Sequence, residues 1–215
     1  MIKTLAFAAA SCLPALLLAQ APAGFTNITP GSGLKGWHRS TTVSHGNTSA
    51  WEVKDGVVTV TQDKEGNGGI ILTDVKYKNF EVSLEMNPDF GCDSGLFLRS
   101  TERGEAYQVM LDYLPGGNMG GTYGEALKNV KGAPARDWEK YWKKGELNSI
   151  RARIEGAVPH IQVWMNGTQV TDWTDTENHL PGGAEDGMIA LQVHGGTRCK
   201  PGLYHRFRNV GVKEF

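Results

Sequence analysis

The sequence predicts an all-β fold, a jelly-roll sandwich of two antiparallel sheets. Short segments alternate apolar and polar residues with a period of two, as strands with one buried face do. Turn signals separate these segments, because the chain contains 28 glycines and an Asn166-Gly167 pair that favours a tight hairpin. Helical spacing is scarce, so the crossover helices of a parallel sheet are not expected. Two packed sheets suit the number of short strands.

Strands are expected in order along the chain wherever the alternation holds. The clearest runs from Phe80 to Met86, where every second residue is apolar, while Glu81 and Glu85 face away and are expected to form a solvated face. The segment 136–144 has helical spacing and is expected to be one short helix or an irregular loop. The expected strands cover residues 51–53, 57–60, 69–72, 80–86, 93–99, 107–112, 150–154, 160–165, 168–172, 188–194 and 207–213.

The first 23 residues have the pattern of a secretory signal peptide. Lys3 precedes an apolar run over 5–18, and small residues around Ala21 form the exit. A membrane-spanning helix is the alternative, but Pro14 and Gln20 interrupt a run that is already short. We therefore expect residues 1–23 to be a signal peptide and residues 24–215 one exported domain, periplasmic or extracellular, without a transmembrane anchor after cleavage.

The charge balance and the cysteine count narrow the class of protein further. The net charge is −1, so no basic surface for nucleic acid is expected. Beyond the leader only Cys92 and Cys199 remain. In an oxidising compartment they could form one disulfide, and two separate thiols are the alternative.

Polar side chains share one face in three of the expected strands. The period of two puts Leu96 and Leu98 on one side of the strand 93–99 and its polar residues on the other. The same pattern recurs in 107–112 and 188–194. We therefore expect a sheet with one apolar face packed on the core and one polar face that binds a ligand. The polar residues on the second face are Asp93, Arg99, Gln108, Asp112, Gln192 and His194.

Several segments, in order along the chain, resemble the 3-keto-disaccharide hydrolase domain family. They are residues 33–37, 51–56, 93–99, 107–112, 121–124, 166–167, 187–195 and 207–210. The resemblance implies a concanavalin A-like lectin/glucanase sandwich that cleaves glycosides with a ketone at carbon 3, after a sugar 3-dehydrogenase has made the ketone. The chain departs from the family where an acidic residue usually precedes the Gln of the second strand. Here the nearest acid, Glu105, lies three residues before Gln108 and joins the polar face only through a bulge.

The chemistry of such a substrate requires particular groups. A ketone at carbon 3 acidifies the hydrogen on carbon 2, so a base can remove it and expel the anomeric substituent, and water adds afterwards. Asp112 and His194 are the candidate bases, and Arg99 is the candidate partner of the enolate oxygen. Gln108 and Gln192 are candidate ligands of sugar hydroxyls. Two residues of a glycine-rich loop, Tyr123 and Glu125, are candidate clamps or acids over the substrate.

Simpler roles remain open for each candidate. Arg99 could only pair with Asp93 or Asp112, His194 could cap a turn, and Asp112 could start the turn before Pro115. No cofactor is certain, and the six histidines lack close metal-binding spacing, although a divalent metal held by His194 and Asp112 is compatible with the pattern. A non-catalytic carbohydrate-binding module is the main alternative function, and a cell-surface interaction domain is a third.

Overall fold

The fold is described from a computed structural model, over residues 20–42, 46, 50–87, 91–200 and 202–215. The signal peptide expected at residues 1–23 lies almost entirely outside this range. Within it, no helix combines the length and the apolar composition needed to cross a bilayer.

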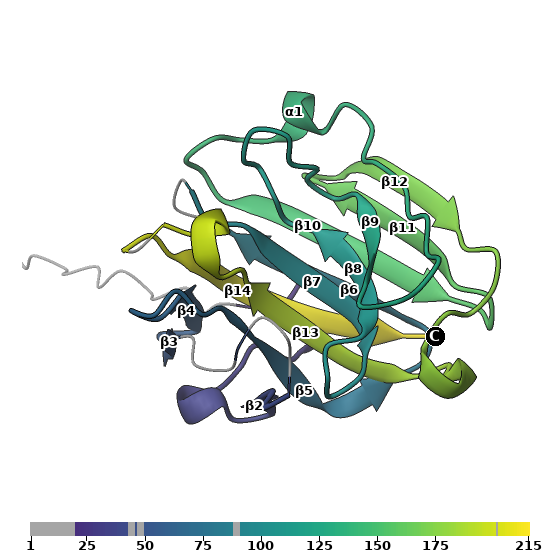
Figure 1. Cartoon of the computed structure of the whole chain (residues 1–215), viewed down its shortest axis with the longest axis horizontal. Coiled ribbons are helices and arrows are strands. Elements are labelled where there is room, and N and C mark those ends of the chain that lie inside the picture. The colour runs from purple at the N-terminus through teal and green to yellow at the C-terminus, as the bar shows by residue number, and fades with distance from the viewer. Residues whose placement is uncertain (1–19, 43–45, 47–49, 88–90, 201) are drawn as a thin grey trace, which may run out of the picture.

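Two antiparallel sheets face one another, as the sequence predicts (Figure 1). Among the described residues, one sheet has eight strands in the order β12-β11-β10-β6-β14-β4-β3, with β1 beside β14. The other has six, in the order β2-β5-β13-β7-β8-β9. The strands are β1 (Thr26–Asn27), β2 (Trp37–Arg39), β3 (Ala50–Lys54), β4 (Val57–Thr61), β5 (Gly69–Tyr77), β6 (Phe80–Met86), β7 (Ser94–Ser100), β8 (Ala106–Met110), β9 (Thr122–Glu125), β10 (Asn148–Glu155), β11 (His160–Met165), β12 (Thr168–Thr174), β13 (Gly187–Val193) and β14 (His205–Glu214).

The alternating pattern locates most strands well. β6 and β11 have the bounds expected from the sequence, and Asn166 and Gly167 form the turn between β11 and β12. The expected helix shortens to α1 (Trp138–Tyr141), a single turn outside the two sheets (Figure 1). Glu81 and Glu85 do not form a merely solvated face, because Glu81 is buried against Arg151 and Glu85 contacts Arg208.

The main core fills the space between the two sheets. Phe80 and Leu84 of β6 are fully buried there, together with Leu96 of β7 and Leu191 of β13. Each comes from the apolar positions of an alternating strand. Burying one such side chain contributes about 1.5–3 kcal/mol to the stability of the fold. This apolar layer therefore provides most of the free energy that holds the two sheets together.

The opposite face of the six-stranded sheet, which we call the outer face, has two distinct halves. One half is a second apolar cluster, made of Ile70, Leu72, Phe97, Ala106, Met188 and Ala190. The turn between β7 and β8 covers it, since Ser40 Oγ donates a hydrogen bond of 2.7 Å to the Glu102 carbonyl next to the edge strand β2. Because β13 and β5 lie between β7 and β2, this turn crosses the sheet. The other half of the outer face is polar.

Candidate functional site

Two glutamine side chains meet on the polar half of the outer face. Gln108 of β8 and Gln192 of β13 approach through Nε2 and Oε1 at 3.3 Å, although β7 separates their strands. Gly95 of β7 makes this possible, because a Cβ there would overlap Gln108 Nε2 and lie 2.9 Å from Gln192 Oε1. The sequence pattern correctly put both glutamines on one face, and the glycine brings their amides together.

Two carboxylates and a guanidinium lie at the same end of the outer face. Arg198 Nε donates to Asp93 Oδ2 at 3.3 Å, and Arg198 Nη2 donates to Asp112 Oδ2. The other Asp112 oxygen accepts the Leu114 backbone N–H at 3.0 Å, as in the turn-starting role left open for this residue. Asp112 therefore binds a guanidinium and also starts a turn.

The electrostatic setting distinguishes the two carboxylates. Burial raises the pKa of the Asp93 carboxyl above its ordinary value, and the nearby Asp112 carboxylate raises it further. His194 and Arg198 act in the opposite direction without cancelling this rise. Asp93 thus retains its proton to a higher pH than an ordinary aspartate does.

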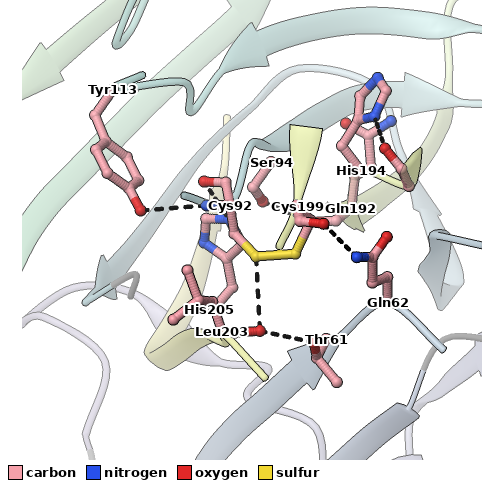
Figure 2. Close-up of a disulfide and its surroundings, with 11 residues drawn as sticks. Thr61, Gln62, Cys92, Ser94, Tyr113, Gln192, His194, Cys199, Leu203 and His205 are labelled. Carbon is pink, nitrogen blue, oxygen red and sulfur yellow. Dashed lines mark hydrogen bonds between the residues drawn. A yellow bond between two sulfur atoms is a disulfide. The ribbon is translucent and has the colours of Figure 1, made fainter. Parts of the chain in front are cut away.

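A disulfide holds the segment that carries Arg198 against the residues that lead into β7, where Asp93 lies. Cys92 and Cys199 are bonded, so the pairing alternative of the sequence analysis is confirmed (Figure 2). On either side, Asp93 N–H donates to the Arg198 carbonyl at 2.8 Å, and Lys200 N–H donates to the Gly91 carbonyl at 3.0 Å. The guanidinium is thereby fixed to the sheet although it lies outside any strand.

His194 follows Gln192 on the same face and is half-buried. Figure 2 shows its ring turned to the Gly195 carbonyl, which lies 2.8 Å from Nδ1. A carbonyl only accepts hydrogen bonds, so Nδ1 carries a proton and Nε2 is the basic nitrogen of the neutral ring. The ring also lies close enough to Asp93 to lower the pKa of that carboxyl.

The placement expected for Arg99 is wrong. Leu98 and Arg99 oppose the single residue Ile189 in the pairing of β7 with β13, and Arg99 has φ 53°. This bulge turns Arg99 away from the outer face. Its fully buried guanidinium donates to the carbonyls of Lys78 at 2.7 Å and Gly156 at 3.0 Å, and to Asn79 Oδ1 at 3.1 Å. Arg99 joins turns of the two sheets and does not meet Asp112 or His194.

Tyr123 and Glu125 lie on the strand β9 and not in a loop, which corrects the expectation from the glycine-rich sequence. Tyr123 pairs with Gln108 and is 50% exposed, so its ring stands at the border of the polar half. Glu125 pairs with Ala106, in the apolar half. Ala106 and Met110 are about 13 Å apart along β8, so Glu125 cannot share one sugar ring with Asp112. Glu105 accepts a hydrogen bond from Thr101 within the β7–β8 turn and does not join the site.

The site offers no evident metal cage. Among the residues that the structure describes, no three His, Cys, Asp or Glu side chains are placed to hold one ion. Asp112, which the sequence analysis paired with His194 for this purpose, has both oxygens bound to Leu114 and Arg198.

Arg198 is the site residue that strand periodicity did not select, and Asp93 is a residue that it selected without giving it a catalytic role. Arg198 lies after β13, between the expected strands 188–194 and 207–213, where no two-residue period operates. Asp93 was on the expected polar face but had no assigned role. The site as built comprises Asp93, Gln108, Asp112, Gln192, His194 and Arg198.

Solved structures with the same architecture include carbohydrate-related proteins. A protein described as a glycosyl hydrolase from Parabacteroides distasonis is 22% identical, with a TM-score of 0.61 over 89% of this chain and 99% of that one. The carbohydrate-binding module CBM66 from Bacillus subtilis is 14% identical, with a TM-score of 0.56 over 83% and 96%. A variant of the alginate lyase Aly36B with bound alginate tetrasaccharide is 15% identical, with a TM-score of 0.57 over 92% and 96%. At these identities the likeness concerns the fold.

Among curated protein sequences, none matches this chain. The family pattern, in contrast, covers nearly all of it, since residues 24–213 match the 3-keto-alpha-glucoside-1,2-lyase-like domain. This confirms the resemblance found in the sequence. Together with the jelly-roll fold, it indicates a carbohydrate-active or carbohydrate-binding protein. The chain belongs to the 3-keto-alpha-glucoside-1,2-lyase-like domain family.

Proposed function

We propose that the protein cleaves 3-keto-glycosides at the polar half of the outer face. One observation carries the proposal. In a chain of this family, a histidine with a defined basic nitrogen, a guanidinium and two glutamine amides lie together at one end of the sheet. Such a site has a base, a cation and hydroxyl ligands, which are the groups that elimination next to a ketone requires.

His194 is the base in this proposal. Nε2 takes the proton from carbon 2 of the sugar, and the electron pair passes into an enolate that extends to the oxygen on carbon 3. Of the two bases that the sequence offered, His194 suits the step better, because both oxygens of Asp112 already accept hydrogen bonds. A positioned general base contributes about 10²–10⁴-fold to the rate.

Arg198 takes the role that the sequence analysis gave to Arg99. Its guanidinium stabilises the negative charge on the enolate oxygen, and Asp112 and Asp93 orient it from two directions. When the enolate collapses, the carbon–oxygen bond at the anomeric position breaks and a double bond forms between carbons 1 and 2. We assign the Asp93 carboxyl, which lies beside Arg198 and whose pKa is raised by burial, as the donor of a proton to the departing oxygen. Water then adds across the double bond.

Gln108 and Gln192 bind the hydroxyls that the reaction leaves unchanged. The two residues are buried, with 7% and 1% exposure, so their side chains are held in place before substrate arrives. Tyr123 lies beside them and can cover one face of the sugar. On this view, a sugar 3-dehydrogenase acts first on the same glycoside in the same exported compartment.

The test compares a 3-keto-glucoside with its unoxidised parent glucoside. The purified protein should release the aglycone from the ketone substrate only. His194→Gln should lower kcat/KM by about 10²–10⁴-fold, and Arg198→Met by about 10²–10³-fold. His160→Gln is the matched control, because His160 lies on β11 of the other sheet, and it should keep full activity. Saturable glycan binding without any turnover would instead favour the carbohydrate-binding alternative.

A further inference from the structure

A recess adjoins the proposed site on the side of Arg198. It measures about 360 Å³ and is lined by Gly91, Leu114, Pro115, Thr197, Arg198 and Lys200. This volume lies within the range of about 300–1,000 Å³ that is typical of small-molecule sites. Two of its walls begin next to the site carboxylates, because Gly91 comes two residues before Asp93 and Leu114 two residues after Asp112.

The walls of the recess differ in chemistry. Leu114 and Pro115 form an apolar side, and Thr197, Arg198 and Lys200 bring a hydroxyl and two cations. Arg198 contacts both Asp93 and Asp112, yet neither carboxylate lines the recess. Within the described part of the chain, no carboxylate lies in ion-pair contact with Lys200. The recess therefore presents positive charge beside an apolar surface.

The backbone of Lys200 is fixed next to Gly91, and the residue is exposed. Its backbone N–H donates to the Gly91 carbonyl at 3.0 Å, one residue from the Cys92–Cys199 disulfide. Its side chain runs over Gly91, where an added Cβ would lie 3.3 Å from Lys200 Cδ. The glycine leaves room for the lysine stem, and Lys200 forms part of the lining of the recess.

We propose that this recess is the leaving-group subsite and that it selects 3-keto-glycosides whose aglycone has an apolar body and a carboxylate. The inference rests on the proposed function. The sugar ring lies over Gln108, Gln192 and His194, and the anomeric oxygen points to Arg198 and Asp93. The aglycone then enters the space beyond Arg198, with its apolar body against Leu114 and Pro115 and its carboxylate near Lys200.

The probes are two aryl 3-keto-glucosides that differ only in one substituent. One carries a 3-carboxyphenyl group and the other the neutral 3-carbamoylphenyl group, so size and leaving-group character are nearly matched. The wild-type protein should cleave the carboxylate with a kcat/KM about two- to fivefold higher, as expected for one exposed charge pair. This preference should decline as salt is raised from low to physiological concentration.

Variants test whether Lys200 causes the preference for the carboxylate substrate. Lys200→Met should lower kcat/KM for the carboxylate substrate to that for the amide substrate, and Lys200→Arg should retain the preference. Lys54→Met, on the edge strand β3 of the other sheet, is the matched control and should behave like the wild type. Equal cleavage of both substrates by the wild-type protein, or an equal effect of Lys200→Met on both, would overturn the inference while leaving the proposed function intact.

Binding supplies a readout that does not depend on turnover. The two unoxidised aryl glucosides should bind with the same preference for the carboxylate when measured by calorimetry, and Lys200→Met should remove it. If neither keto substrate is cleaved, the proposed function fails. A preserved, Lys200-dependent preference in binding would then still support the recess as an anion-selective site, and its absence would reject the recess as well.

Discussion

Gly95→Ala should lower activity through the Gln108–Gln192 pair while leaving the stability of the fold nearly unchanged. The glycine lies between the two amides, and an alanine Cβ would overlap Gln108 Nε2 and sit 2.9 Å from Gln192 Oε1. Gly95 is not among the residues with positive φ, so the backbone accepts alanine without strain. The nearest atoms that the added Cβ would meet belong to the two glutamine side chains, which must move apart.

The effect on stability should be small because two contributions oppose each other. Losing the buried amide–amide hydrogen bond costs about 0.5–1.5 kcal/mol. Replacing a strand glycine by alanine returns about 0.5–1 kcal/mol through the entropy of the unfolded chain. The free energy of unfolding in urea should therefore change by less than about 1 kcal/mol.

The effect on catalysis should be much larger. Two hydrogen bonds to substrate hydroxyls at about 0.5–1.5 kcal/mol each correspond to roughly a 5- to 150-fold fall in kcat/KM. In a Gln108→Ala background, the added Cβ meets only one amide, so Gly95→Ala should cause a clearly smaller further loss. Full activity in Gly95→Ala at unchanged stability would refute a sugar-binding role for this pair. Equal losses in both backgrounds would refute the steric reasoning.

Three further variants test the roles of Arg99, of the disulfide and of His38. Arg99→Met should lower the free energy of unfolding by about 3 kcal/mol, because the buried carbonyls of Lys78 and Gly156 lose their charged donor. The kcat/KM of the folded protein should stay unchanged. A loss of kcat without a loss of stability would show that Arg99 acts in the site. The double variant Cys92→Ser/Cys199→Ser should lower the free energy of unfolding by about 2–4 kcal/mol in chemical denaturation. It should also lower kcat/KM, because the segment that carries Arg198 loses its anchor. Full activity would contradict this anchoring role. Desolvation lowers the pKa of His38, but hydrogen bonds to Glu102 and Asp74 outweigh it, so the net pKa is raised. The stability that His38 adds over His38→Gln is therefore complete below about pH 6.5 and lost as pH rises through the higher folded-state pKa; a difference that grows with pH in denaturant titrations would reverse the sign.

Much of the fold follows from the two-residue period, because each strand buries one face against the same core. The pattern therefore located β6 and β11 and put Gln108, Asp112, Gln192 and His194 on one side of the sheet. Predicting this part of the site required only that the strands be regular and lie in one sheet. The alternation of apolar and polar residues within each strand was sufficient for that.

The rest of the site depends on features that local periodicity cannot describe. One extra residue in β7 reverses the direction of Arg99, and a bulge of this kind depends on the partner strand β13. Arg198 reaches the site through a disulfide between residues separated by 107 positions, so its place depends on the closed fold. β9 forms because its backbone pairs with β8, although its sequence of Thr, Tyr, Gly and Glu has no alternating apolar face.

The central claim is that the bond between carbon 2 and its hydrogen breaks at His194 before the glycoside is released. The most direct measurement compares kcat/KM for a 3-keto-glucoside with hydrogen or deuterium on carbon 2. We expect a primary isotope effect in the wild-type protein and loss of turnover in His194→Gln. Release of the aglycone without an isotope effect, at the same rate from the unoxidised glucoside, would contradict it.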